Sequence, residues 1–361
     1  MNFQKISPIQ TTTTIDSTVD FFVVSDHMPG SSVNWAADLP LDQIRVKYFG
    51  QNTIVDMFNN QGLNPDDYFF IFDHYLNLKD FEGYFYPNFL LTTAVDYQKF
   101  SPNHVIDFTQ KKYSVNCVMN KPRLARYIAS CWLYNNKIDG LLHTQSWSQN
   151  SSVSINQLDE LLQLGKLIDW THKFGPAVKM LDQHWIDYNG NLSTDYGRND
   201  ENFFNGGINT IFDTTAISIV LEPVFWENGS IATEKYMHAI YGGTIPVVSG
   251  YQIYDSLNKL GFDTFSDIID TSSQYELDPV LRIWNMLEKN KNLFLQWQDL
   301  ILDPLVQNRI VNNLNLLQNP EKIFKNSIRL NSKRSLDKIV SLNESLKSYG
   351  FQYFDMLPIP E

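Results

Sequence analysis

Apolar runs alternate with polar loops along most of the chain, and their spacing predicts strands followed by helices. Short segments rich in apolar, aromatic and β-branched residues predict strands at 19–25, 68–72, 89–95, 113–119 and 141–147. Apolar residues three and four apart predict helices over 122–134, 279–297, 304–317 and 321–327. An edge strand is expected at 268–270 and a frayed start at 1–17. Such alternation is typical of an α/β protein with parallel sheets.

The most informative pattern lies between residues 216 and 265. A β-branched apolar run ends at Glu222, and after a polar loop the run Thr233-Glu234-Lys235 opens a helix of about two turns. The pair Gly242-Gly243 ends that helix, and a second buried run follows at 244–248. A strand, a helix and another strand at this spacing predict a βαβ unit.

The position of Lys235 has two interpretations. It lies in the first turn of its helix, where the positive end of the helix dipole disfavours a cation. Either its side chain extends away into water, or it stands beside the free N–H groups of the helix start to bind an anion such as a diphosphate. The helix dipole leaves both interpretations open.

These residues resemble the donor-binding motif of the α1,3-fucosyltransferases. That motif has a glutamate, then threonine-glutamate-lysine, then a valine-proline-valine run, and here Glu222, Thr233-Glu234-Lys235 and Ile245-Pro246-Val247-Val248 match it. Glycosyltransferase-like proteins of phages and large viruses share the pattern and continue it with leucine, leucine-glycine-phenylalanine and threonine-phenylalanine. The residues that match this continuation are Leu257, Leu260, Gly261, Phe262, Thr264 and Phe265.

The resemblance implies a GT-B fold, in which two Rossmann-like domains face each other across a cleft and a C-terminal helix crosses back. Residues 1–110 are then expected to form the acceptor-side domain and residues 111–330 the donor-binding domain, with 331–361 packing back on the first. The implied activity is transfer of a sugar from a nucleotide-diphosphate sugar, such as a GDP- or UDP-sugar, to a glycan hydroxyl. The implied reaction is inverting and independent of metal. The loop Phe225-Trp226-Glu227-Asn228 departs from the fucosyltransferase pattern, so the sugar stays open between hexose, pentose and fucose.

Further donor-binding residues are expected around the predicted helix 122–134. Arg123 and Arg126 lie one turn apart and share a face at its start, as surface arginines or as anion ligands. In the families that this chain resembles, an arginine at that place meets the diphosphate. With Lys235, these arginines would balance the charge that develops on the leaving group. The hydrogen-bonding residues expected in the same site are Glu222, Asn228, Thr233 and Glu234.

An inverting transfer also needs a base for the acceptor hydroxyl. Asp26, Asp73 and Asp96 each follow a predicted strand of the first domain, where open α/β sheets carry their chemistry. Asp73 is the first choice, with Asp26 and Asp96 behind it. A carboxylate in such a position is also a common helix cap or turn residue.

Two alternatives to a glycan-directed transferase stay open, and the charge pattern bears on the first of them. The formal net charge of −12 gives no global attraction for nucleic acid, but the stretch 322–338 is basic. That stretch fits a solvated or interdomain face, or a transferase that glycosylates hydroxymethylated bases in DNA. A third possibility is a non-catalytic protein that binds nucleotide sugars and has lost the base.

Several motifs do not occur in the sequence. No Asp-x-Asp or zinc-spaced His/Cys cluster is found, so we expect no metal and no cofactor beyond the nucleotide sugar. Walker A, GxGxxG and GxSxG patterns are missing, which argues against nucleotide hydrolysis, nicotinamide chemistry and an α/β-hydrolase. The first twenty residues show no secretory signal, and no window approaches 18 apolar residues. These features predict a cytoplasmic protein without a membrane span, in the host cytoplasm if it is viral.

Overall fold

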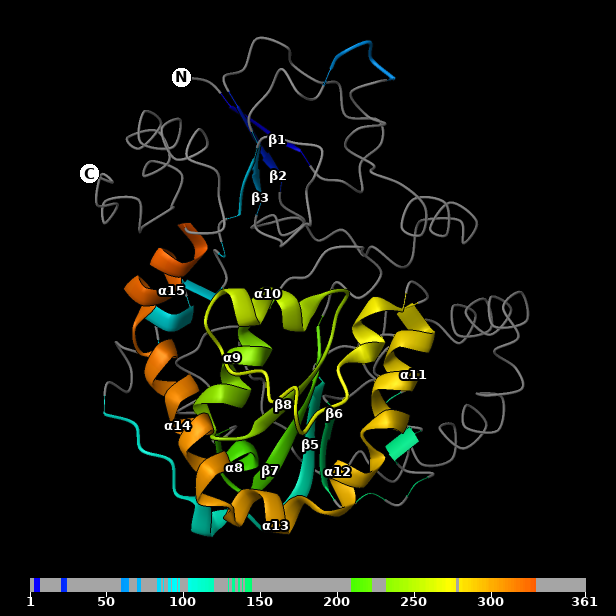
Figure 1. Cartoon of the computed structure of the whole chain (residues 1–361), viewed down its shortest axis with the longest axis vertical. Helices are drawn as coiled ribbons and strands as arrows, with labels where there is room; N and C mark the ends of the chain where they lie inside the picture. The colour runs from blue at the N-terminus through cyan, green and yellow to red at the C-terminus, as the bar shows by residue number, and fades with distance from the viewer. Residues whose placement is uncertain are drawn as a thin grey trace.

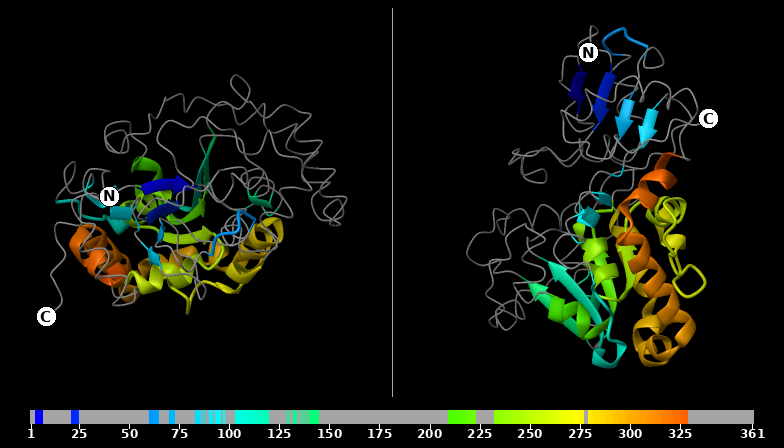
Figure 2. Two further views of the ribbon diagram at one scale, coloured as in Figure 1. Left: turned by 90° about the horizontal axis from the view of Figure 1, so that it is seen from above. Right: turned by 90° about the vertical axis from the view of Figure 1, so that its left-hand side faces the viewer.

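Parallel sheets organise the part of the chain that the structure, a computed structural model, describes (Figure 1). The described residues are 3–6, 21–24, 60–64, 70–72, 83–85, 87, 90–91, 93–95, 97, 103–119, 129, 132–133, 136, 138, 140–144, 209–222, 232–276 and 279–328. Within them lie two four-stranded sheets, both entirely parallel. The right-hand view of Figure 2 shows them as separate groups of strands. This arrangement confirms the α/β class.

The first sheet has the order β1-β2-β3-β4. Its strands are β1 (Phe3–Ile6), β2 (Phe21–Val24), β3 (Phe70–Phe72) and β4 (Gly83–Phe85). β2 and β3 confirm the strands predicted at 19–25 and 68–72. The expectation of a frayed start is wrong at β1, because pairing with β2 orders a segment too short to be recognised alone. No strand was predicted at β4.

The second sheet has the order β6-β5-β7-β8. Its strands are β5 (Tyr113–Met119), β6 (Gly140–Thr144), β7 (Thr215–Leu221) and β8 (Ile245–Ser249). All four were predicted within a few residues of these bounds. β7 and β8 are buried at every position, as expected of parallel strands covered on both faces.

Helices surround the second sheet, and α9 packs against both β7 and β8 (Figure 1). α14 packs on α9, α12 contacts β5 and α13 contacts β7. The α-helices are α8 (Asn209–Asp213), α9 (Glu234–Tyr241), α10 (Ile253–Lys259), α11 (Pro279–Lys289), α12 (Lys291–Leu295), α13 (Trp297–Leu302), α14 (Pro304–Leu317) and α15 (Pro320–Ile328). Two 3-10 helices are η2 (Phe108–Gln110) and η3 (Ser272–Tyr275).

The strand predicted at 89–95 is wrong, because the described residues there are helical. The buried apolar positions are 90, 91, 94 and 97, which follow the spacing of a helix rather than of a strand, and Thr93 is buried beside them. A short, mainly apolar run does not distinguish a buried strand from a buried helix. Asp96 was chosen as a candidate base because it would end that strand, so this argument no longer supports it. Asp96 itself lies outside the described residues.

Two further predictions fail near α11. The edge strand at 268–270 is wrong, because the backbone N–H groups of Ile268 and Ile269 both donate to the Phe265 carbonyl and form a turn. The long helix at 279–297 is divided into α11, α12 and the start of α13. At the first break, the Asn290 amide bonds the backbone N–H and C=O of Asp270. This tertiary contact favours a break over continued helix. By contrast, α14 and α15 match their predictions.

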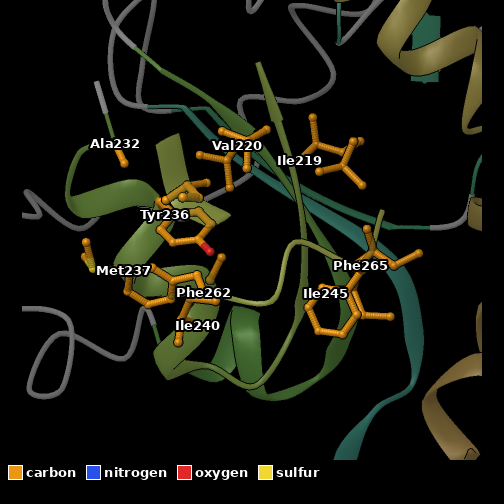
Figure 3. Packing of buried hydrophobic residues seen from close by; sticks show 14 of the residues in the cluster. Ile219, Val220, Ala232, Tyr236, Met237, Ile240, Ile245, Phe262 and Phe265 are labelled. Carbon is orange, nitrogen blue, oxygen red and sulfur yellow. The ribbon is translucent and has the colours of Figure 1, made fainter. Parts of the chain in front are cut away.

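The core of this second region lies between α9 and the sheet. Figure 3 shows Tyr236, Met237 and Ile240 of α9 beside apolar side chains of the strands and of the loop after α10. Both glycines that end α9 are packed closely. A Cβ on Gly242 would lie 2.1 Å from Cβ of Phe212, and one on Gly243 would lie 2.3 Å from Cγ2 of Ile106. Gly243 also has a φ of +64°, so the Gly-Gly pair meets both a steric and a conformational need.

Candidate functional site

The carboxyl edge of the second sheet contains a topological switch point between β5 and β7. From β5 the sheet continues to β6 on one side and to β7 on the other. Asn116 pairs with Ser218, and the same register brings Met119 level with Leu221 at the ends of these strands. In open parallel sheets, ligands bind in the crevice outside such a point.

β7 ends at this edge with Leu221, and α9 begins at Glu234 after the loop that follows. Thr233 is its N-cap, with extended backbone and a hydroxyl that accepts from the Lys235 N–H. Glu234 lies in the first turn, where a carboxylate is favoured by the helix dipole. The predicted start at Thr233-Glu234-Lys235 is therefore confirmed, as is the end at Gly242.

Glu222, the first residue after β7, is directed to this helix start. Its carboxylate oxygens accept from the backbone N–H of Thr233 at 2.9 Å and from the Thr233 hydroxyl at 2.5 Å. The Glu222 N–H donates to the Ser249 hydroxyl at the end of β8. Glu222 is 2% exposed and Thr233 is fully buried. The carboxylate therefore braces the two ends of the loop that joins β7 to α9.

Lys235 is held at the helix start rather than extended into solvent. Its side chain is 21% exposed, and its Nζ lies 2.5 Å from Oε1 of Glu234 and 3.3 Å from the Thr233 hydroxyl oxygen. These two contacts use two of the three ammonium donors. Among the described residues, no contact uses the third. The local geometry thus disfavours the interpretation of Lys235 as a lysine extended into water, and its binding of an anion stays a prediction.

The two carboxylates of the site differ in electrostatic environment. Burial raises the pKa of Glu222 to about 7, although Lys235 and the two bonds from Thr233 act in the opposite direction. For Glu234, burial also favours the neutral form, but the adjacent Lys235 ammonium outweighs it and lowers the pKa to about 2. At neutral pH the site therefore holds one ionised carboxylate, one ammonium and one carboxyl that titrates.

The structure brings four predicted site residues together: Glu222, Thr233, Glu234 and Lys235. The others lie outside the described residues, so their roles stay predictions: Asp26, Asp73, Asp96, Arg123, Arg126 and Asn228. Three of them follow described strands closely in the sequence. Asp73 directly follows β3 and Asp26 follows β2 by one residue, and these two parallel strands are paired. In the sequence, three residues separate Arg123 from the end of β5.

Ser249 is a polar residue of this edge that sequence reasoning missed. It ends β8, is 1% exposed, and its hydroxyl accepts the Glu222 N–H. A hydroxyl residue at the carboxyl end of a buried strand, beside a glycine, was the available signal. Its hydrogen bond couples the ends of β7 and β8.

The second part of the resembling motif is structural. Gly261 follows α10 with φ +96°, and Phe262 packs edge-on against Tyr236 at 5.5 Å. Both carboxylate oxygens of Asp263 contact the Arg309 guanidinium, which also lies 4.6 Å above the Phe265 ring. This segment anchors the loop after α10 to α14. It positions α9 through its core and supplies no group to the helix start.

Two negative findings apply to the described part of the chain. No group of three or more His, Cys, Asp and Glu side chains there is arranged to hold a metal ion. None of the helices described combines the length and the apolar character needed to cross a bilayer. Comparison of the chain with protein-family models, curated proteins and solved structures found no match. The interpretation of the site therefore depends on its geometry.

Proposed function

We propose that the chain is a GT-B glycosyltransferase that moves a sugar from a nucleotide-diphosphate sugar to an acceptor hydroxyl. One observation carries the proposal: the Lys235 ammonium is held, partly buried, at the N-terminus of a helix beside a topological switch point. A diphosphate is an anion that such a helix start and ammonium would bind together. The resemblance around Glu222 and Thr233-Glu234-Lys235 supports a nucleotide sugar as the ligand class and leaves the nucleotide and the sugar open.

The donor would exchange contacts with the pair formed by Glu234 and Lys235. In the absence of ligand, the two side chains neutralise each other at 2.5 Å. A ligand that carries both phosphate oxygens and hydroxyl groups offers a partner to each: the ammonium takes the phosphate, and the carboxylate accepts from a ribose or sugar hydroxyl. Lys235, aided by Arg123 and Arg126, would then balance the charge on the departing diphosphate.

Glu222 would stabilise the donor site without contacting the donor. We had expected its carboxylate to bind donor hydroxyls, but both of its oxygens accept from Thr233. In the proposal it therefore fixes the N-cap of α9 and the ends of the β7–α9 loop. Asn228, within that loop, keeps its predicted role at the donor.

The acceptor side belongs to the first sheet. Because β2 and β3 are parallel neighbours, their carboxyl ends meet at one edge, where Asp26 and Asp73 follow. We propose Asp73 as the base that takes the proton from the acceptor hydroxyl in an inverting displacement, with Asp26 as the next candidate. Lys235, Arg123, Arg126 and the helix start would supply the charge stabilisation that other transferases obtain from a metal.

A thermal-shift screen against GDP-, UDP-, CMP- and dTDP-sugars tests donor binding. A ligand of the native state raises the melting temperature according to RT ln(1 + [L]/Kd). Wild type should respond to at least one donor, and Lys235→Ala should weaken that response by at least tenfold in Kd. Lys259→Ala, an exposed lysine in the last turn of α10, serves as the control. No response to any donor would refute the proposal.

Turnover measurements separate an enzyme from a binding protein. With the donor that binds, Asp73→Asn should keep the thermal shift and lose transfer by about 100-fold or more. Transfer should persist in EDTA. Binding without transfer to any glycan acceptor would favour the non-catalytic alternative, and transfer to hydroxymethylated DNA alone would favour the DNA-directed one.

A further inference from the structure

Glu222 and the proposed ligand depend on the same ammonium. Within the described part of the chain, the charged groups that face the Glu222 carboxyl are Lys235 and Glu234, both from α9. From β8, the uncharged Ser249 hydroxyl accepts from the backbone N–H of Glu222. Lys235 is thus the group whose charge favours the ionised form of a carboxyl that is 2% exposed. The same Lys235 carries the donor left for an anion.

An anion at Lys235 changes the environment of Glu222 in two ways. Its charge offsets the ammonium, so the interaction that favours ionised Glu222 weakens. It also adds a negative charge near a buried carboxyl, where solvent screens poorly. Both effects favour the protonated form of Glu222. The two hydrogen bonds from Thr233 favour the ionised form both with and without the anion, so they do not cancel this change. A neutral carboxyl can still accept the Thr233 N–H and donate to the Thr233 hydroxyl oxygen.

We propose that an anion binding to Lys235 drives uptake of one proton by Glu222, so that ligand and proton bind together. The proposal rests on the anion site of the proposed function. By linkage the effect is reciprocal. Protonation of Glu222 increases the affinity for the anion by the same factor by which the bound anion increases the affinity of Glu222 for its proton. The proton comes from solvent when the ligand enters and returns to it when the ligand leaves.

Proton uptake by Glu222 should be largest near neutral pH. Since the pKa of Glu222 is about 7 without ligand, a bound anion raises it further, and a proton is taken up between the two values. Glu234 also loses its ammonium partner, but it starts from a pKa of about 2, and its side chain is 38% exposed. It therefore stays ionised at neutral pH. Anion affinity should be highest below about pH 7 and fall by up to about tenfold per pH unit above it.

Isothermal titration calorimetry at about pH 7.5, in two buffers of different ionisation enthalpy, counts the protons. UDP-glucose, GDP-fucose and sodium sulfate are the probes, because none of them titrates near neutrality. Wild type should take up a fraction of a proton to one proton per bound anion, and Glu222→Gln close to none. Glu321→Gln removes an exposed carboxylate of α15 and should behave as wild type. Equal uptake in wild type and Glu222→Gln would overturn the proposal.

A second variant tests the same coupling without ligand, in case Glu222→Gln does not fold. Lys235→Gln removes the ammonium charge, as an anion would offset it, and leaves the carboxyl intact. Carboxyl-carbon NMR should show Glu222 titrating at higher pH in Lys235→Gln than in wild type. Titration at an unchanged pH would contradict the coupling.

The outcomes distinguish this proposal from the function on which it rests. Sulfate binding with proton uptake, without a response to either nucleotide sugar, would support the coupling and count against the transferase. Nucleotide-sugar binding without proton uptake at Glu222 would support the transferase and refute the coupling. If no probe binds at any pH, there is no anion site at the start of α9 and both proposals fail.

Discussion

Glu222 holds Thr233 by two hydrogen bonds across eleven positions of sequence, one to its backbone N–H and one to its hydroxyl. This pair joins the carboxyl end of β7 to the N-cap of α9. Thr233 in turn accepts from both the backbone N–H and the ammonium of Lys235. A buried carboxyl therefore determines where the helix begins and where its cation lies.

The buried Glu222 carboxyl should make stability depend on pH. Burial raises its pKa from 4.5 to about 7, so the folded state binds its proton more tightly than the unfolded state does. Its contribution is fully present below about pH 4.5 and is lost as pH rises through about 7, a change of about 3 kcal/mol. The difference in the free energy of unfolding between wild type and Glu222→Gln, measured by urea unfolding across this pH range, gives this contribution. A difference that is independent of pH would contradict the prediction.

Lys111 should show the opposite pH dependence. Its Nζ donates to the carbonyls of Phe212 and Gly242 at 2.8 Å each, and these lie at the C-terminal ends of α8 and α9. Burial lowers its pKa from 10.5 to about 7, even though Asp213 and Asp107 favour the charged form. Stability from this group is therefore present above about pH 10.5 and is lost as pH falls through about 7.

Lys111→Met tests this assignment by removing both the charge and the two donors. It should destabilise the protein by about 2 kcal/mol, because two buried carbonyls lose their partner. The loss should grow as pH rises from about 7. Lys112→Met, at the exposed neighbouring position, is the control and should change little. Chemical denaturation at neutral and alkaline pH provides the comparison.

Arg309 should be hard to replace even by lysine. Its guanidinium contacts Asp263 and Asp267 at 2.6–3.0 Å and lies over the Phe265 ring. Arg309→Lys keeps the charge but loses the planar fork, so we expect a loss of about 1–2 kcal/mol. The exposed pair of Lys325 and Glu321 is the comparison, and Lys325→Ala should cost less than about 0.5 kcal/mol. Equal effects of the two substitutions would refute the prediction.

Gly261 has both a positive φ and too little space for a side chain, whereas Gly62 has a positive φ alone. Its φ is +96°, and an added Cβ would lie 2.6 Å from Nδ2 of Asn326, which donates to the Leu260 carbonyl. Gly261→Ala should therefore cost about 2–3 kcal/mol in thermal or urea unfolding. Gly62 has φ +71° with nothing within 4 Å of the added atom, so Gly62→Ala should cost about 1 kcal/mol. The larger loss of stability in Gly261→Ala than in Gly62→Ala measures the steric clash with Asn326. A smaller loss in Gly261→Ala than in Gly62→Ala would refute the prediction.

Local signals were sufficient for much of the second sheet. β7 and β8 were recognised because their β-branched residues form short, wholly buried runs. The start of α9 was recognised from the run Thr233-Glu234-Lys235 after a polar loop, and Thr233 is its N-cap. Residues 90–97 show the limit of the same reasoning, because a mainly apolar run fits either element until its partners are known.

The amino-acid sequence by itself determined the alternation of strands and helices, the ends of α9, and the charge pattern of Glu222 and Thr233-Glu234-Lys235. Only the tertiary structure decided that β5 and β7 are neighbours, that Glu222 bonds Thr233, and that Arg309 clamps Asp263 46 positions away. Caps, turns and periodicity depend on neighbours within a few residues, and a sequence displays them directly. Strand order and buried polar pairs depend on packing between distant segments, and many partners of similar chemistry compete for them until the chain has folded.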